Sequence, residues 1–195
     1  GPERKSRAIS LKEKEIIAYH EAGHALVARM LPNADPVHKI SVVARGMAGG
    51  YTKQLPTEDR RLHSVNQLRD ILTTLMGGRA AEELIYGKTE VTTGAHSDLE
   101  HVTAIARGMV KEYGMSEHMG LRTYGRREEL VFLGRMVDEQ KDYGDKVADE
   151  IDAEIMVLVE RAYAEARDIL TKNKAKLIQI AERLIAEETL EGEKL

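Results

Sequence analysis

The chain has 195 residues, of which 42% are apolar and 32% charged, and its formal net charge is −4. This composition suits one globular domain, and the absence of a basic excess argues against a nucleic-acid-binding protein. Because the sequence contains no Cys, disulfide scaffolds and thiolate zinc sites are excluded, so any metal must be held by His, Asp or Glu. No apolar run approaches the roughly 18 residues of a membrane span.

The first predicted element is an amphipathic helix that begins after Ser10. Residues 1–9 are polar and basic, which is typical of a linker, and Ser10 with Glu13 forms the S-x-x-E pattern of a capping box. Pro32 would end the helix. One stripe at three- and four-residue spacing consists of Ile17, His20, His24, Val27 and Leu31. The two histidines are therefore expected on the inward face.

A β-hairpin is predicted next. Residues 37–44 alternate well enough for a strand, the Gly-rich segment 45–50 supplies a turn, and residues 51–55 form the returning strand. Pro56 closes this unit.

A second capping box, formed by Ser64 and Gln67, precedes a helix that extends to about residue 87. The centre of this helix contains Gly77 and Gly78. Because glycine is unfavourable inside a helix, the pair indicates close packing against another backbone.

The rest of the chain is predicted to be mostly helical. Three further helices are expected over about 98–113, 145–172 and 175–187, separated by an irregular, Gly-rich segment at 114–144. Thr189 is expected to cap another helix. The predicted fold is therefore mainly α, with a small β-hairpin element and a long C-terminal helical segment.

Within the first helix, residues 20–24 read H-E-A-G-H. Positions i and i+4 of a helix lie one above the other, so His20 and His24 can direct both imidazoles at one metal ion, with Glu21 beside its open position. A zinc ion lowers the pKa of a bound water from about 15.7 to roughly 7, and Glu21 would take that proton and pass it to the leaving amine. This pattern predicts a catalytic metal.

The alternative is that the pattern arose by chance on an ordinary helix. Two facts argue against it. Both histidines continue the apolar stripe, so without a metal each would need buried hydrogen-bond partners. Gly23, which costs up to about 1 kcal/mol inside a helix, indicates a close approach by another part of the chain.

Catalytic zinc commonly takes three protein ligands and leaves one position for water. A third histidine further along the same helix is absent, because position 27 is Val and position 30 is Met. The spacing leaves five candidates open: Glu82, Glu83, His96, Asp98 and His101.

Six motifs follow one another along the chain. They are H-E-A-G-H-A at 20–25, P-V-H-K-I at 36–40, G-G-R-A-A-E-E at 77–83, T-T-G-A-H-S-D-L at 92–99, G-M-S at 114–116 and V-F-L-G-R at 131–135. These motifs, in this order, resemble the FtsH family of AAA+ proteases, and the likeness covers essentially the whole sequence. Residues 1–7 resemble the family's junction between ATPase and protease domains.

The resemblance implies a helical zinc-metalloprotease domain with one zinc ion per chain. By motif position, His20 and His24 match zinc ligands, Glu21 the catalytic acid/base and Asp98 the third ligand. Glu82 matches an acidic residue near the site that would orient a ligand histidine, and it is the second choice for third ligand. Tyr113 stands where the family often has Trp, and His96 stands at a variable position.

The resemblance also implies a larger protein. Residues 1–9 would link a preceding ATPase domain to a zinc peptidase domain at 10–195, with a catalytic part at 10–144 and C-terminal helices at 145–195. The whole protein would be a membrane-anchored homo-hexamer that uses ATP to deliver unfolded polypeptides and membrane proteins. This domain, itself soluble, would lie on the cytoplasmic side of a bacterial inner membrane or an organellar membrane.

An extended substrate is expected to bind along the hairpin. Gly49, Gly50, Tyr51 and Thr52 lie on its predicted edge, where backbone hydrogen bonds could hold a chain of any sequence. A capped, purely structural hairpin is the alternative at this point. For the whole chain, the competing function is a non-catalytic helical binding or adaptor module with a structural metal or none.

Overall fold

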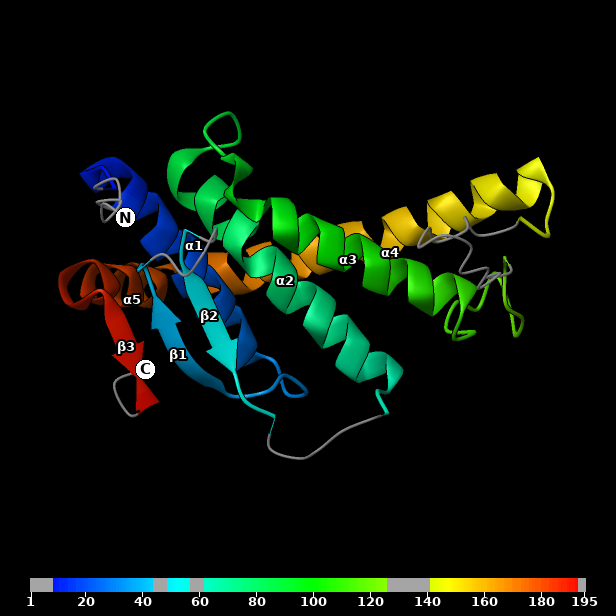
Figure 1. Cartoon of the computed structure of the whole chain (residues 1–195), viewed down its shortest axis with the longest axis horizontal. Helices are drawn as coiled ribbons and strands as arrows, with labels where there is room; N and C mark the ends of the chain where they lie inside the picture. Colours follow the sequence, from blue (N-terminus) through cyan, green and yellow to red (C-terminus); the bar gives the residue numbers. More distant parts are fainter. Residues whose placement is uncertain (1–8, 44–48, 57–61, 126–140, 193–195) are drawn as a thin grey trace, which may run out of the picture. The chain divides into compact units, whose positions relative to one another are not determined.

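The computed structural model describes residues 9–43, 49–56, 62–125 and 141–192. Figure 1 shows helices predominating over a small sheet, so the prediction of a mainly α fold is confirmed. The elements are α1 (Leu11–Met30), β1 (Val37–Ser41), β2 (Tyr51–Gln54), α2 (Val65–Tyr86), the 3-10 turn η1 (Thr93–Ala95), α3 (His96–Lys111), α4 (Asp145–Lys172), α5 (Lys174–Glu187) and β3 (Thr189–Glu191).

The first two helices begin at the predicted caps. The Ser10 hydroxyl accepts a hydrogen bond from the Glu13 backbone N–H at 3.1 Å. At the start of α2 the box is reciprocal, because Ser64 accepts from the Gln67 N–H at 3.2 Å and Gln67 accepts from the Ser64 N–H at 2.8 Å. Gly87 ends α2 with a φ of 93°, which glycine adopts far more readily than other residues.

The sheet has three antiparallel strands in the order β2-β1-β3. The β1–β2 hairpin is confirmed, but the prediction that Thr189 caps another helix is wrong, because Thr189 begins β3. Leu190 in that strand is fully buried opposite Ile40, whereas Glu188 takes a left-handed conformation, with a φ of 65°, that ends α5. Burial of one leucine against β1 therefore outweighs a weak local capping signal.

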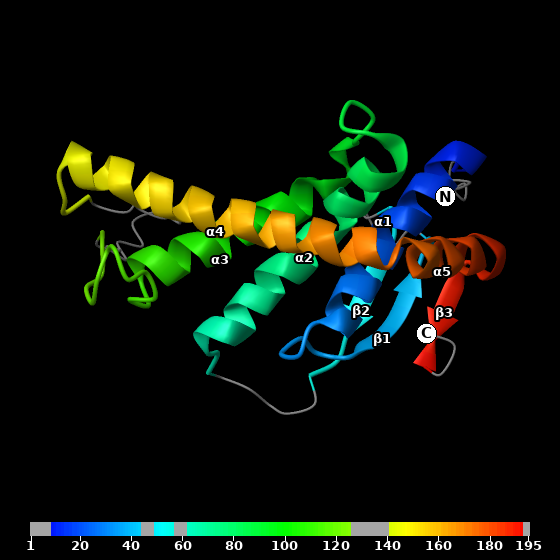
Figure 2. The ribbon, with the colours of Figure 1, turned by 180° about the vertical axis from the view of Figure 1, so that it is seen from behind.

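Helices α1 and α2 pack with their backbones almost in contact, and Figures 1 and 2 both show them side by side. A Cβ atom added to Gly23 would collide with the Gly77 carbonyl oxygen and with Ala81. A Cβ at Gly77 would lie 2.8 Å from the Gly23 carbonyl oxygen. The close approach predicted from these glycines is confirmed, and it brings the histidines of α1 against α2.

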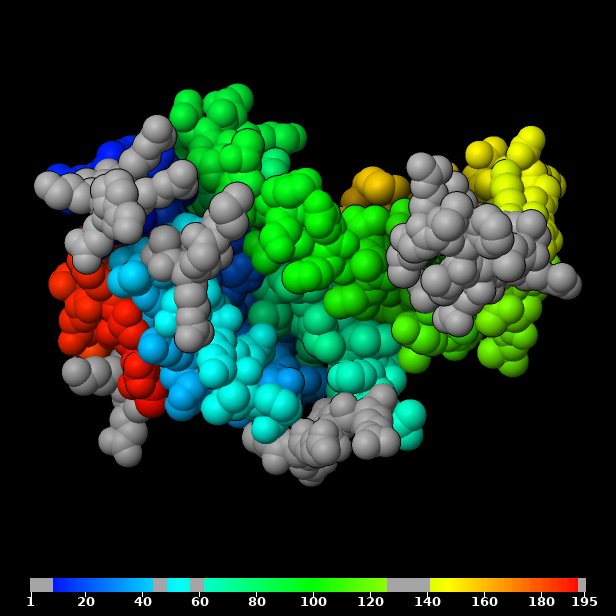
Figure 3. All heavy atoms as spheres, viewed as in Figure 1, coloured from blue at the N-terminus to red at the C-terminus, as the bar shows by residue number. Residues whose placement is uncertain are grey.

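Helix α1 also lies against β1 and β2, so it covers one face of the sheet. Figure 2, seen from behind, shows α1 in front of these strands, and Figure 3 shows the cyan β2 segment at the molecular surface. Among the described residues β2 pairs with β1 alone, which makes it an edge strand with one side open for pairing.

The chain divides into two compact units, one comprising residues up to Leu99 together with Ala162 onward, and the other Glu100–Arg161. In the second unit the loop after α3 is held by hydrogen bonds from Ser116 to Glu154 and from the Tyr124 hydroxyl to the Met119 carbonyl.

The described parts of the segment predicted to be irregular, 114–125 and 141–144, contain no helix or strand. The V-F-L-G-R motif and residues 1–8 of the predicted linker lie outside the described residues. None of the described helices has both the length and the apolar character needed to cross a bilayer.

Candidate metal centre

Three side chains from two helices direct donor atoms at one point. His20 and His24 lie one turn apart on α1, both more than nine-tenths buried, with their Nε2 atoms 3.1 Å apart. Asp98, in the first turn of α3, places Oδ2 at 2.9 Å from His20 Nε2 and at 3.0 Å from His24 Nε2. These three atoms form a nearly equilateral triangle.

The other ring nitrogens of the two histidines are fixed by buried acceptors. His24 Nδ1 donates to the Thr74 carbonyl oxygen at 2.7 Å, and His20 Nδ1 donates to a Glu82 carboxylate oxygen at 2.7 Å. A carbonyl oxygen can only accept, so His24 must carry its hydrogen on Nδ1. This leaves its Nε2 lone pair directed at the triangle, which is how metal-binding histidines are usually oriented.

Glu82 is fully buried and joins two parts of the site. One carboxylate oxygen bonds His20, and the other accepts from the Thr92 backbone N–H at 3.0 Å and the Thr92 hydroxyl at 2.6 Å. Thr92 in turn caps η1, directly before the helix that carries Asp98. Sequence reasoning missed Thr92 and Thr74. Thr92 belongs to the T-T-G-A-H-S-D-L motif at 92–99, which could have pointed to it, but no sequence signal could identify a backbone carbonyl as a partner of His24.

Gly78 provides the space that the imidazoles occupy. A Cβ atom at this position would lie 2.5 Å from His20 Cε1 and 2.6 Å from His24 Nε2. Because real Cβ atoms essentially never approach other atoms so closely, any side chain at position 78 would displace both rings. The second glycine of the α2 pair therefore serves the site, whereas the first serves helix packing.

Glu21 lies beside the histidines and faces the sheet. It is 8% exposed, and its Oε2 accepts a hydrogen bond from the Thr52 hydroxyl at 2.5 Å. A Cβ at Gly50 would lie 3.3 Å from Glu21 Cγ and 2.9 Å from the Ser41 carbonyl oxygen. Of the predicted edge residues, Tyr51 and Thr52 lie in β2 and Gly50 directly precedes it, so this edge begins next to the Glu21 carboxylate.

The electrostatics of the cluster favour one shared positive charge between two carboxylates. Burial acts to lower the pKa of His20, but hydrogen bonds with Asp98 and Glu82 outweigh it and raise this pKa to about 10. Burial acts to raise the pKa of Asp98, and its bonds with both histidines hold that pKa well below the ordinary value instead. The pKa of Glu82 is lowered against burial by His20 and Thr92. The two carboxylates therefore stabilise a positive charge on the His20 ring.

Of the five candidates for the third donor, the structure places one, Asp98, next to the two histidines. Within the described ranges, His20, His24 and Asp98 are the one group of donor atoms close enough to share an ion. Glu82 contacts the far nitrogen of His20, and Glu83 pairs with Arg167. His96 and His101 are both exposed.

The donor set fits zinc. Ligands about 2.0 Å from a tetrahedral zinc ion lie about 3.3 Å from one another, close to the observed separations of 2.9–3.1 Å. Two imidazole nitrogens and one carboxylate oxygen are ordinary zinc donors, and three protein donors leave a fourth position open.

The fold and the site together define a class of protein: a mainly helical domain in which an H-E-x-x-H helix and a distant carboxylate could hold one metal ion, the arrangement typical of metallopeptidases. The family model of peptidase family M41 matches residues 7–195, and the chain belongs to this family.

Curated relatives agree with this assignment. The chain is 55% identical over 195 residues to proteins named ATP-dependent zinc metalloprotease FtsH 1 from Sphaerobacter thermophilus and from Thermomicrobium roseum. It is 50% identical over 196 residues to ATP-dependent zinc metalloprotease FtsH from Thermotoga maritima. In each case all of this chain is covered, but only 30%, 30% and 32% of the respective relative. The chain thus spans about three tenths of their length.

Proposed function

We propose that this chain is a zinc metalloendopeptidase domain. The observation that carries the proposal is the convergence of His20 Nε2, His24 Nε2 and Asp98 Oδ2 beside the Glu21 carboxylate. Membership of peptidase family M41 and the names of the relatives support the same activity.

In this proposal His20, His24 and Asp98 hold one zinc ion per chain. Glu82 and the Thr74 carbonyl keep the two rings in the tautomer that presents Nε2. Bound there, zinc would supply Lewis-acid chemistry, lowering the pKa of water and polarising the peptide carbonyl.

Glu21 is the acid/base. Its carboxylate accepts the proton of the attacking water at Oε1 or Oε2 and later gives it to the leaving amine nitrogen. The Thr52 hydroxyl, which donates to Oε2, holds the carboxylate on the side that faces β2. The proton therefore moves at the point where the sheet edge meets α1.

The substrate lies along the open side of β2, over Gly49, Gly50, Tyr51 and Thr52. An added strand takes hydrogen bonds from the backbone and so accepts many sequences, which suits an enzyme that degrades unfolded chains. The contact between Thr52 and Glu21 supports this assignment, because a chain paired with β2 would pass beside the acid/base.

The whole protein would be larger. The relatives are named ATP-dependent proteases. We infer that residues 1–9 link an ATPase domain to the peptidase domain at 10–195, and that ATP acts only through that ATPase domain. The whole protein would be a membrane-anchored homo-hexamer with this domain on the cytoplasmic side. Its substrates would be unfolded polypeptides and membrane proteins, which the ATPase domain delivers. Sedimentation of the isolated chain tests whether residues 145–195 contribute to assembly: a monomer at high concentration would contradict such a role.

The competing adaptor function is not supported by the donor count. A structural zinc site is normally closed by four protein ligands, whereas the described residues offer three at this point.

The test is the Glu21→Gln variant, compared with Glu13→Gln on the exposed face of the same helix. Glu21→Gln should keep a full equivalent of zinc and lose at least about 100-fold in kcat/KM for peptides, because only the proton acceptor is lost. Glu13→Gln should match the unaltered chain in zinc content and in kcat/KM. Hydrolysis that survives Glu21→Gln would overturn the proposed chemistry.

A further inference from the structure

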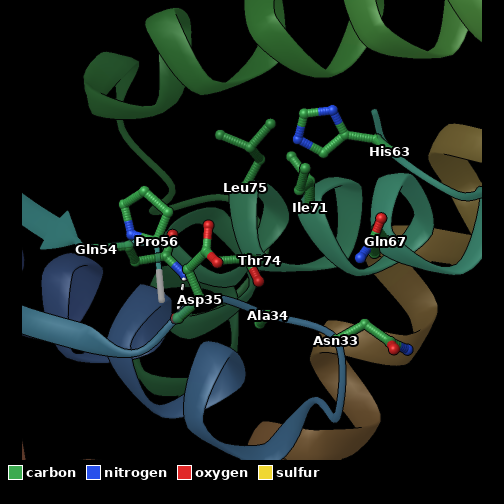
Figure 4. Close-up of a pocket in the computed structure, with 10 residues that line it drawn as sticks. All are labelled: Asn33, Ala34, Asp35, Gln54, Pro56, His63, Gln67, Ile71, Thr74 and Leu75. Carbon is green, nitrogen blue, oxygen red and sulfur yellow. Dashed lines mark hydrogen bonds between the residues drawn. The ribbon is translucent and has the colours of Figure 1, made fainter. Parts of the chain in front are cut away.

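A cavity of about 230 Å³ opens at the C-terminal end of β2. One water takes about 30 Å³ of the liquid, so this is space for a long side chain rather than a single solvent molecule. Figure 4 shows Ile71 and Leu75 side by side on one wall, as expected for residues four apart on α2, with Pro56 opposite. The loop after α1 supplies the floor.

Two of the residues that line this cavity connect it to the metal centre. Thr74 lines the cavity, and its carbonyl oxygen is the atom that accepts the hydrogen bond from His24 Nδ1. Gln54, at the other side, lies two residues beyond Thr52, whose hydroxyl contacts Glu21. Alternate residues of a strand share a face and lie about 6.6 Å apart, so the cavity is about two substrate residues from the acid/base.

The cavity wall is rich in hydrogen-bond acceptors. The Asp35 carboxylate has no hydrogen-bond or ion-pair partner among the described residues, and Figure 4 shows it projecting between Pro56 and Thr74. The Thr74 hydroxyl is buried and has no hydrogen-bond partner in the described parts of the chain. Gln54 uses its amide nitrogen to bond the Asp35 carbonyl at 2.7 Å, which leaves its amide oxygen as a further acceptor. No Lys or Arg is among the described residues that line the cavity.

We propose that this cavity is a specificity subsite for a Lys or Arg side chain of the substrate, two residues from the cleaved bond. The inference rests on the proposed peptidase function. The aliphatic stem would pack on Ile71 and Leu75, while the cationic head donates to Asp35, Thr74 and Gln54. A neutral aliphatic side chain would fill the same space but leave the buried Thr74 hydroxyl and the Asp35 carboxylate without a partner.

The experiment compares peptides that carry either Lys or norleucine, which has a similar stem and no charge, at each position within three residues of the cleaved bond. The ratio of kcat/KM for Lys over norleucine should be about fivefold at a position two residues from the bond and near one elsewhere. In Asp35→Asn this ratio should fall toward one, and in Asp35→Lys it should fall below one. Because each ratio is taken within one variant, a general loss of activity cancels.

Glu90→Gln is the matched control, since it removes an exposed carboxylate that does not line the cavity. Its ratio should equal that of the unaltered chain. A uniform ratio near one at all positions, or a preference that survives Asp35→Asn, would overturn the subsite.

Binding separates this proposal from the peptidase activity. Zinc-loaded Glu21→Gln should bind a fluorescent Lys peptide about fivefold more tightly than the norleucine peptide. The double variant that carries both Glu21→Gln and Asp35→Asn should bind the two peptides equally. If the chain hydrolyses no peptide yet shows this difference, the proposed function fails and the subsite stands. If it hydrolyses peptides and shows no difference, only the subsite fails.

Discussion

His20 donates to Glu82 through Nδ1 at 2.7 Å, while its Nε2 lies 2.9 Å from Asp98, so one ring lies between two carboxylates with different roles. Only Asp98 also reaches His24, at 3.0 Å. Asp98→Ala should therefore abolish zinc binding, whereas Glu82→Gln should weaken it by about 10- to 100-fold, the usual cost of losing a group that orients a ligand. Competition with a chelator of known affinity measures both values.

Glu83→Gln is the control for this pair, because Glu83 is the neighbouring residue and pairs with Arg167 instead of the cluster. It should bind zinc normally. If Asp98→Ala retains full zinc and activity while Glu82→Ala loses them, the choice of third ligand is wrong.

The sequence predicted α1 and its histidine pair because helical spacing and a capping residue are local signals. The third donor was different. Periodicity left five candidates open, and Asp98 was chosen only through the family resemblance, since no local rule says which distant turn folds back onto α1. The tertiary contact with the Thr74 carbonyl and the pairing of β3 depend on how α2 and α5 pack, and a single sequence does not encode such packing in any short pattern.

Gly78→Ala should greatly weaken zinc binding without changing any donor. The added Cβ would collide with both imidazoles, so the rings must turn away from Asp98 or α2 must shift. We expect zinc affinity to fall roughly tenfold or more, by analogy with the loss of an orienting group. Overpacking should also reduce the free energy of unfolding by about 1–3 kcal/mol. Chelator competition and urea denaturation measure the two effects.

Gly144→Ala is the matched control, because a Cβ there meets no atom of the described residues within 4 Å. Its zinc affinity should be unchanged. Normal zinc binding by Gly78→Ala would mean that the histidine rings occupy a different position from the one described.

The chain from which zinc has been removed should lose stability as the pH rises. Burial lowers the pKa of His20, but the bonds to Asp98 and Glu82 outweigh it and raise this pKa from 6.5 to about 10. A histidine whose pKa is higher in the folded than in the unfolded chain contributes stability that is complete below about pH 6.5 and is lost as the pH rises through about 10. The decline should be on the order of a few kcal/mol.

Urea denaturation with a chelator between pH 6 and pH 10 measures this dependence. His20→Gln, which cannot take up a proton, should flatten it. A metal-free chain whose free energy of unfolding does not fall across this range would show that His20 is not held protonated by the two carboxylates.

The substrate strand makes a prediction that separates backbone from side-chain recognition. In β2 the backbone N–H groups of alternate residues point to β1 and to the open side. Leu55 donates its N–H to Pro36 beside β1, so Tyr51 also faces β1 and Thr52 faces the open side. Thr52→Pro removes this open N–H, so it should raise KM for peptides about five- to tenfold while zinc content stays at one equivalent. Thr52→Ala also loses the hydroxyl that contacts Glu21 but keeps the N–H, and it should change KM much less. Equal KM values for the two variants would exclude strand addition at β2, because the backbone N–H is the property in which they differ.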